Sequence, residues 1–172
     1  MTDNRAAGSS VRSGVPQGTG SDSSAPVTEI PADPLQARDP GNPPVPSGAL
    51  LLELVPLPVT DLDRSIEFYR DRAGFHLDVD VTPAPDVRIV QLTPPGSACS
   101  ILLSAGLPTT GAPAGTVRGL HLVVADIAAA RNVLLDRGIE VGDIEDVGGG
   151  VLYAYFADPD GNTWCLQYMP WR

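Results

Sequence analysis

Hydrophobic and polar residues alternate along short runs of this chain, and the runs predict strands and helices in a fixed order. Leu51 to Val59 alternates with the two-residue period of a β-strand. Two prolines within that run remove backbone donors, which predicts either a strand at the edge of a sheet or a bulge. Apolar residues then recur at helical spacing from Leu62 to Tyr69, with Asp61 as the expected N-cap and Gly74 as the expected end.

Three further strand patterns follow this helix. Proline fixes φ and glycine accepts positive φ, so both residue types are typical of the turns between strands. The strands are expected near Phe75 to Val81, from Val87 to Leu92 and from Ala98 to Leu103, with a loop at Pro83 and Pro85 and a turn at Pro94-Pro95-Gly96. The first half of the chain is therefore predicted to form a βαβββ module.

The same order occurs again in the second half. The expected elements are a strand from Gly119 to Val124, a helix from Ile127 to Arg137, a strand from Ile139 to Val141, a loop at Gly148-Gly149-Gly150, and a hairpin of Val151 to Ala157 with Thr163 to Met169. The register is shared, because Asp126 follows Asp61 and Pro159 follows Pro94 at the same separation of 65 residues. The chain thus contains a duplicated module. Each module alone would leave one sheet face open, so the two are expected to pair and enclose a cleft.

Composition divides the chain into a tail and a domain. Residues 1–48 are rich in Ser, Gly and Pro and lack a periodic apolar pattern. Such a segment cannot bury enough apolar surface to offset the entropy of ordering, which predicts a disordered tail. The expected domain covers residues 49–172, with module one at 50–104, a linker at 105–118 and module two at 119–170.

The charge of the chain narrows the classes of partner. The 172 residues carry a formal net charge of −10, and all 11 basic residues are arginines. An acidic surface repels phosphate backbones, so no nucleic acid partner is expected. The lack of lysine excludes Schiff-base chemistry and a P-loop. No apolar run approaches the roughly 18 residues that a membrane helix needs, so no membrane partner is expected.

The cysteine content bears on the compartment. Cys99 and Cys165 are the only two cysteines, and two are too few for a disulfide framework. The N-terminal residues show no apolar core of a signal peptide. A cytoplasmic location is therefore expected.

Three segments of the chain resemble a known superfamily. Val59-Thr60-Asp61-Leu62, Phe68-Tyr69-Arg70-Asp71 and Asp158-Pro159-Asp160-Gly161-Asn162 are similar to segments of vicinal oxygen chelate proteins, which include glyoxalase I, extradiol dioxygenases and bleomycin-binding proteins. The resemblance implies an α+β fold whose two βαβββ modules pair into a U-shaped mixed sheet around a cavity. It also implies a homodimer, and a divalent metal held by residues on the first and last strands of each module.

The residues at the implied metal positions depart from the family pattern. They are Leu54 and Ser100 in the first module and Gly119 and Cys165 in the second. None is the expected His, Gln or Glu, and divalent ions need imidazole or carboxylate donors in number. We therefore expect a degenerate metal site and assign no cofactor.

Strand alternation places further candidates on the expected cavity face. His121 is one of them, and Cys165 and Gln167 share a strand face two residues apart. Tyr153 and Tyr155 also point to one side, which predicts an aromatic wall. The expected cavity lining is Leu54, Ser100, Gly119, His121, Tyr153, Tyr155, Cys165 and Gln167.

Each polar candidate has both a functional and a structural interpretation. His121 could ligate a metal or act as an acid or base, or it could be a hydrogen-bonded pocket residue. Cys165 could bind a soft metal or act as a nucleophile, or it could pack as a small apolar side chain. Gln167 could hydrogen-bond a ligand or the backbone. Candidate metal ligands are His121, Cys165 and Gln167.

The leading hypothesis is a small-molecule-binding protein of the glyoxalase and bleomycin resistance type, with a small organic ligand and an incomplete metal site. The alternative is a divalent-metal-dependent lyase or dioxygenase of the same superfamily. It would use a displaced donor set of His121, Gln167 and Cys165, with Glu53 or Glu140. A third interpretation is a dimerisation or partner-docking scaffold, which an exposed apolar patch would favour.

Overall fold

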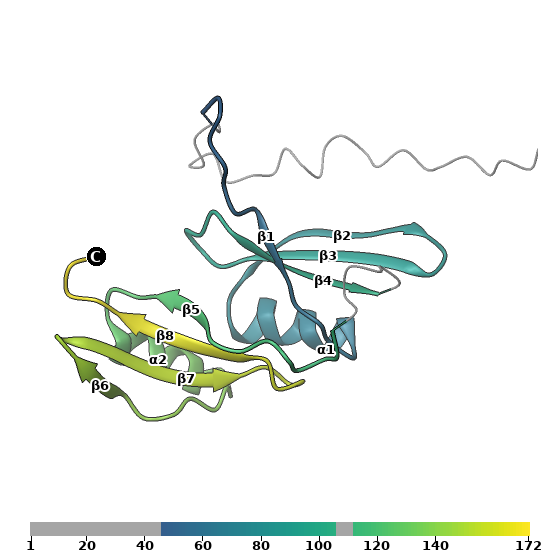
Figure 1. The fold of residues 1–172 in the computed structure, drawn as a ribbon. Helices are drawn as coiled ribbons and strands as arrows, with labels where there is room; N and C mark the ends of the chain where they lie inside the picture. The colour runs from purple at the N-terminus through teal and green to yellow at the C-terminus, as the bar shows by residue number, and fades with distance from the viewer. Residues whose placement is uncertain (1–45, 106–111) are drawn as a thin grey trace, which may run out of the picture.

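A computed structural model describes residues 46–105 and 112–172 of the chain (Figure 1). The predicted tail at residues 1–48 therefore lies almost wholly outside the described residues. The same holds for residues 106–111 of the predicted linker.

The first module forms a four-stranded mixed sheet with one helical segment. Its elements are β1 (Leu54–Pro56), α1 (Leu62–Ile66), the π-helical turn η1 (Glu67–Arg72), β2 (His76–Ala84), β3 (Val87–Thr93) and β4 (Ser100–Ala105). The strand order is β1-β4-β3-β2, and β1 runs parallel to β4. The edge position that the prolines predict for the first strand is confirmed.

The second module repeats this topology. Its elements are β5 (Leu120–Val123), α2 (Ile127–Asp136), β6 (Glu145–Gly148), β7 (Val151–Ala157) and β8 (Thr163–Tyr168). The order β5-β8-β7-β6 matches that of the first sheet, with β5 parallel to β8. The predicted α+β fold of two paired βαβββ modules is confirmed, and the described strands form two sheets without a closed barrel.

Both predicted helix caps are confirmed. The Asp61 carboxylate accepts the backbone N–H of Arg64, and the Asp126 carboxylate accepts that of Ala129. Each bond satisfies one of the free donors in the first turn of a helix. Capping accounts for both aspartates, so neither is assigned a chemical role.

Three strand predictions differ from the structure at their boundaries. The first strand is limited to Leu54–Pro56, and the Pro58 carbonyl instead accepts hydrogen bonds from Gly115 and Asn162. In contrast, β2 extends through Pro83 instead of giving way to a loop. It is the outer strand of its sheet, where a missing donor does not cost a ladder bond. Finally, β4 continues to Ala105, inside the predicted linker.

The strand predicted at Ile139 to Val141 is wrong. This segment makes only an isolated bridge between Val141 and Phe156, and β6 lies further along the chain. Ile139 and Val141 are both buried in the core. The segment therefore lies beside β7 with its apolar side chains in the core, while the solvent-exposed β6 forms the regular edge strand of the sheet.

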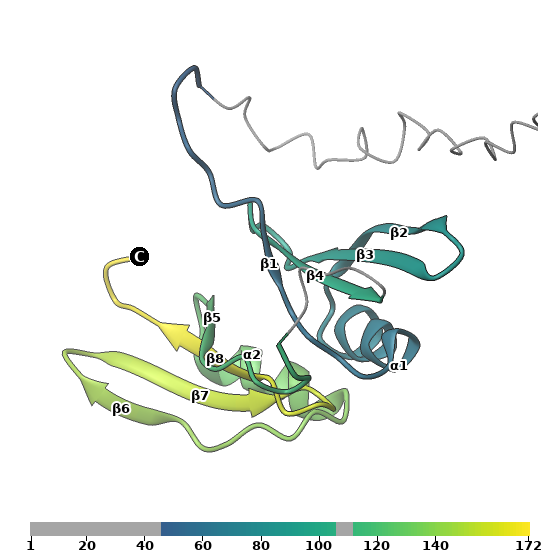
Figure 2. The ribbon, with the colours of Figure 1, turned by 45° about the vertical axis from the view of Figure 1, so that its right-hand side comes forward.

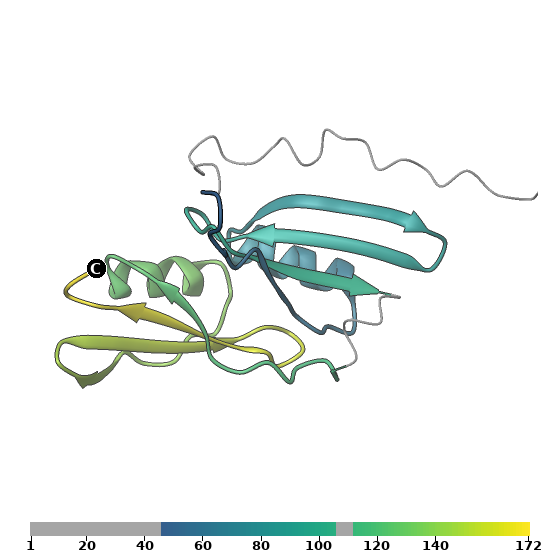
Figure 3. The same cartoon turned by 45° about the horizontal axis from the view of Figure 1, so that its top comes forward.

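Each helix covers one face of its own sheet, and the two modules lie next to one another (Figures 1, 2 and 3). The core lies between these layers and includes Leu92 and Leu103 of the first module and Trp164 of the second. Aromatic rings join the modules: the Tyr69 and Trp164 centroids are 5.8 Å apart, and those of Phe75 and Trp164 are 5.6 Å apart. Among residues 46–105 and 112–172, no helix lies on the opposite face of either sheet.

The turn between β7 and β8 fastens the second module to the first. Tyr69 donates its hydroxyl hydrogen to the Asp158 carboxylate over 2.8 Å and accepts the Trp164 indole N–H over 3.0 Å. Burial, followed by the adjacent Asp158 charge, raises the pKa of the Tyr69 hydroxyl well above its usual value. This phenol remains protonated at any physiological pH, and it acts as a structural hydrogen-bond donor between the modules.

Candidate functional site

The open face of the second sheet gathers five of the candidate residues. The strand pairing places His121 beside Cys165 and Cys165 beside Tyr155, while Gln167 lies beside Tyr153. Their sequence neighbours Trp164 and Phe156 point to the other face and belong to the core. We call the surface formed by His121, Tyr153, Tyr155, Cys165 and Gln167 the second-sheet wall.

A hydrogen bond orients the imidazole of this wall. His121 Nδ1 lies 2.9 Å from Gln167 Oε1, and the Gln167 amide nitrogen lies 3.4 Å from the Tyr153 hydroxyl. A carbonyl oxygen only accepts, so Nδ1 carries the hydrogen and neutral His121 keeps Nε2 as an acceptor. The histidine is exposed, which leaves Nε2 available to a ligand.

The aromatic rings of the wall meet edge to face. The His121 and Tyr153 ring centroids are 5.4 Å apart, and those of Tyr153 and Tyr155 are 6.1 Å apart, with interplanar angles of 80° in both cases. Tyr155 keeps 43% of its surface exposed. Rigid aromatic side chains with exposed faces offer a large contact area at a small entropic cost.

Cys165 lies beneath this surface as a thiol. It is fully buried, and it donates its S–H to the Leu166 carbonyl over 3.3 Å. Burial is the main reason that the pKa of the Cys165 thiol lies above its usual value, and the charge of Glu145 adds to the rise. The thiolate is the nucleophilic form, so the environment of Cys165 favours packing over covalent chemistry.

The strand register pairs different residues from those that the sequence spacing brings together. Leu54 lies beside Ser100 in the first sheet, and in the second sheet His121, not Gly119, takes the equivalent place beside Cys165. The reason is the connection from strand to helix, which contains two more residues in the first module. The backbone N–H of Leu57 donates to Leu102 of β4, and that of Val124 donates to Gln167 of β8 in the equivalent place. Leu57 precedes the helix cap of its module by four residues, whereas Val124 precedes its own by two.

The donors at these positions do not fit a divalent metal. Leu54 has no donor atom, and the Ser100 hydroxyl is taken up in hydrogen bonds with Gln91 and Thr93. Only His121 and the protonated Cys165 remain, whereas zinc sites have at least three protein ligands. Within residues 46–105 and 112–172, no group of three or more His, Cys, Asp and Glu side chains could hold a metal ion.

The bonds of Ser100 were not foreseen from the sequence. Ser100 is 5% exposed and hydrogen-bonds two polar side chains of the neighbouring strand β3. These bonds depend on the lateral register of β3 and β4, and no local sequence pattern encodes that register. Alternation along β3, which places Gln91 and Thr93 on one face, was the only available signal.

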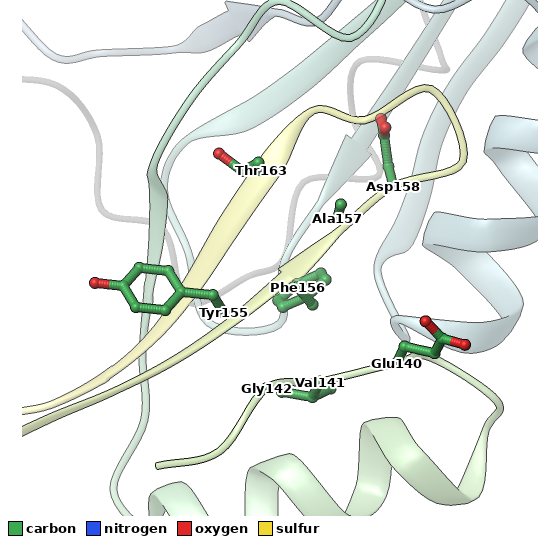
Figure 4. A pocket seen from close by; sticks show the side chains of 8 residues that line it. All are labelled: Glu140, Val141, Gly142, Tyr155, Phe156, Ala157, Asp158 and Thr163. Atoms are coloured by element: carbon green, nitrogen blue, oxygen red, sulfur yellow. The ribbon is translucent and has the colours of Figure 1, made fainter. Parts of the chain in front are cut away.

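A pocket of about 850 Å³ lies beside the second half of β7 (Figure 4). It opens where β6 no longer covers the strand, because β6 pairs only with Val151, Leu152 and Tyr153. Its lining consists of Glu140, Val141, Gly142, Tyr155, Phe156, Ala157, Asp158 and Thr163. Tyr155 belongs to both the pocket and the second-sheet wall, so the two surfaces adjoin.

The described residues include no helix that is both long and apolar enough to cross a membrane. Cys99 and Cys165 are both free thiols.

Comparison with solved structures finds similar proteins, among them two described as glyoxalase/bleomycin resistance proteins and one described as an antibiotic-binding protein. The antibiotic-binding protein TnmS3 from Streptomyces sp. CB03234 is 32% identical with a TM-score of 0.62, and the match covers 70% of this chain and 97% of TnmS3. A glyoxalase/bleomycin resistance protein from the same organism is 34% identical with a TM-score of 0.58, covering 67% of this chain and 98% of its own. A superfamily member from Sphaerobacter thermophilus DSM 20745 is 29% identical with a TM-score of 0.62, covering 70% and 98%.

No curated protein matches the chain. The sequence model of one family matches residues 51–166, which include every helix and strand of the described residues except the last residues of β8. The chain belongs to the Glyoxalase/Bleomycin resistance protein/Dioxygenase superfamily.

Proposed function

We propose that this protein binds a small organic molecule on the second-sheet wall, in the manner of a drug-binding member of its superfamily, without a metal ion. The observation that carries the proposal is the wall itself. Two tyrosines and a histidine lie edge to face on a sheet surface without a helix, and Gln167 holds the imidazole in place. Such a surface suits a flat aromatic ligand with a hydrogen-bond donor for His121 Nε2.

The relatives support this ligand class. TnmS3 is described as an antibiotic-binding protein, and it shares 32% of its residues with this chain. We propose that the ligand here is an aromatic antibiotic or a molecule of similar shape. The net charge of −10 favours ligands that are neutral or cationic over anionic ones.

Isothermal titration of the full chain against a panel of aromatic antibiotics, with bleomycin included, tests the proposal. For any antibiotic that binds, Tyr155→Ala is expected to weaken the affinity by about fivefold or more, because truncating a central aromatic contact of an interface costs over about 1 kcal/mol. Trp171→Ala is the matched control. It removes another exposed aromatic ring, 69% accessible, from outside the wall.

Equal losses for Tyr155→Ala and Trp171→Ala would contradict the assignment of the wall. A panel without any binder, measured on folded protein, would contradict the choice of aromatic antibiotics. Metal content measured by elemental mass spectrometry tests the proposal that binding needs no metal ion. One equivalent of tightly held metal that the ligand requires would contradict metal-free binding.

A metal-dependent lyase or dioxygenase is the second candidate function. One observation favours it: His121 and Cys165 lie side by side on parallel strands. The carboxylates of Glu53 and Glu140 do not complete a metal site with these two residues within the described part of the chain. Glu140 lines the pocket beside β7, and Glu53 precedes β1. Loss of a metal-dependent turnover in His121→Ala, with the fold intact, would support this alternative.

We also propose that the protein is a cytoplasmic homodimer whose ligand-binding domain is residues 49–172. The exposed apolar side chains of Leu50, Leu51 and Leu52 before β1, together with Val123 on β5, support a self-interface. The two free thiols support a reducing compartment. Light scattering after gel filtration measures the oligomeric state, and a monomer across micromolar concentrations would contradict the dimer.

A further inference from the structure

The open face of the first sheet carries a row of hydrogen-bonded polar side chains. It runs across three strands, from Asp78 on β2 to Thr93 and Gln91 on β3 and Ser100 on β4. The helix-facing side of the same strands is apolar, with residues such as Leu92 and Leu103 in the core. The polar row therefore lies on the face away from α1, where the two-residue period of the strands puts it.

A β-bulge aims Asp78 into this row. The pairing of β2 with β3 shifts between Leu77 and Val79, so that Asp78 is the extra residue of the outer strand. Its carboxylate accepts the Thr93 hydroxyl through Oδ2 and contacts His76 Nδ1 at 2.8 Å through Oδ1. Bulges commonly redirect a side chain beside a functional site.

The carboxylate fixes the direction of every hydrogen bond in the row. An ionised carboxylate only accepts, so Thr93 donates its single hydroxyl hydrogen to Asp78. Ser100 must then donate to the Thr93 oxygen, 2.6 Å away. The Ser100 oxygen is left to accept the Gln91 amide N–H over 3.0 Å, which sets the orientation of the Gln91 carboxamide.

Two hydrogen-bonding groups of Gln91 remain after this bond. Its Nε2 keeps a second N–H, and its Oε1 has no hydrogen-bond partner within the described residues. An amide so oriented offers one donor and one acceptor side by side. Val79 and Leu102 pair with Gln91 on either side and share its face, so apolar surface flanks the amide.

We propose that Gln91 recognises the donor–acceptor edge of a neutral carboxamide, lactam or imide group on an otherwise apolar ligand. An anionic group is excluded by the nearby Asp78 and by the orientation of Arg88, which turns to the helix side to bond Asp63. The inference deepens the proposed function and rests on it, since it presumes that the chain binds small molecules. Asp78, Thr93 and Ser100 act as positioning residues, because they hold Gln91 rather than touch the ligand.

Benzamide serves as the probe, with methyl benzoate as the matched comparator that has an acceptor but no N–H. Both are titrated into the full chain labelled with nitrogen-15, and the backbone and side-chain amide signals are followed by NMR. Benzamide is expected to shift the Gln91 side-chain amide signals and to bind about tenfold more tightly than methyl benzoate, because the latter leaves the Gln91 acceptor unpaired.

Three variants separate the role of Gln91 from a general effect on the fold. Gln91→Met is expected to abolish the tenfold preference. Thr93→Val breaks the row and is expected to reduce the preference, while Thr93→Ser restores the hydroxyl and the preference. A purely structural role for Thr93 would alter stability and leave the ratio of the two affinities unchanged.

Equal affinities for benzamide and methyl benzoate would overturn the inference, as would shifts confined to the second-sheet wall with Gln91 unmoved. In both cases probe binding would persist, so the proposed function would stand. Should Gln91→Met fail to fold, the Gln91 side-chain signals of the unmodified protein decide the question. The inference would also be overturned if neither probe shifted the NMR signals of either sheet. The antibiotic titration would then decide the proposed function separately.

Discussion

Asn162 is the residue whose removal should weaken the junction between the modules most clearly. It is fully buried in the turn between β7 and β8. Its side-chain nitrogen donates to the Pro58 carbonyl over 3.0 Å and to the Asp158 carboxylate over 2.8 Å. Its side-chain oxygen accepts the Val117 N–H over 3.1 Å. One amide thus links the end of the first strand segment, the approach to β5 and the turn itself.

The magnitude for Asn162→Ala follows from counting the groups that lose a partner. The Pro58 carbonyl and the Val117 N–H lose the bonds that Asn162 provides, and each such group costs about 1–3 kcal/mol. Asp158 keeps three donors, namely the Tyr69 hydroxyl and the backbone N–H groups of residues 160 and 162, so its loss is small. We expect a decrease of about 4 kcal/mol in the free energy of unfolding, a large part of the roughly 5–15 kcal/mol of an ordinary domain.

Urea unfolding followed by tryptophan fluorescence measures this decrease, because Trp164 is buried beside Tyr69 in the same junction. Asp126→Ala is the matched control. It removes one exposed capping bond of α2 and is expected to cost about 1 kcal/mol. A loss for Asn162→Ala no larger than that of the control, at an unchanged m-value, would refute the reasoning that this amide joins the modules.

Three further predictions follow from individual contacts. Burial opposes ionisation of Asp160, but hydrogen bonds from Thr60 and Arg64 outweigh it and hold the pKa of the Asp160 carboxyl below its usual value, so stability is present at neutral pH and declines as pH falls below about 4. Arg64→Ala should flatten that decline in acid-unfolding curves, and an unchanged curve would contradict the link. Gly115→Ala should cost about 2–4 kcal/mol in thermal unfolding, because its φ is +70° and a Cβ would lie 1.9 Å from the Asp160 carbonyl oxygen; wild-type stability would be the contrary result. In the folded protein, Ellman's reagent should modify Cys99 before the fully buried Cys165, and mass mapping of the first adduct to Cys165 would show that the second sheet opens.

The local features of the fold were accessible from the sequence. The caps at Asp61 and Asp126, the proline-marked edge at β1 and the hairpin of β7 and β8 all depend on residues close in the chain. Their conformations follow from backbone propensities and side-chain periods that operate over a few residues. Duplication then made the order of strands and helices readable, because the second copy repeats the first at a fixed separation.

The strand at Ile139 to Val141 shows where this kind of inference fails. An apolar alternation indicates burial, but it does not say whether the partner is a neighbouring strand or the core beneath one. The segment lies beside β7 with a single bridge to Phe156, and in that position Ile139 and Val141 are both buried in the core.

Lateral pairing is what the tertiary structure alone decided. Residue patterns alone predict the duplicated α+β modules and a set of residues that alternate onto one face. They could not place His121 beside Cys165, because a connection two residues longer in the first module shifts the register of the opening strands. Nor could they show that a bulge at Asp78 orders the row that orients Gln91. Contacts between strands join residues far apart in the chain, and their register is set by loop lengths and core packing rather than by any local pattern.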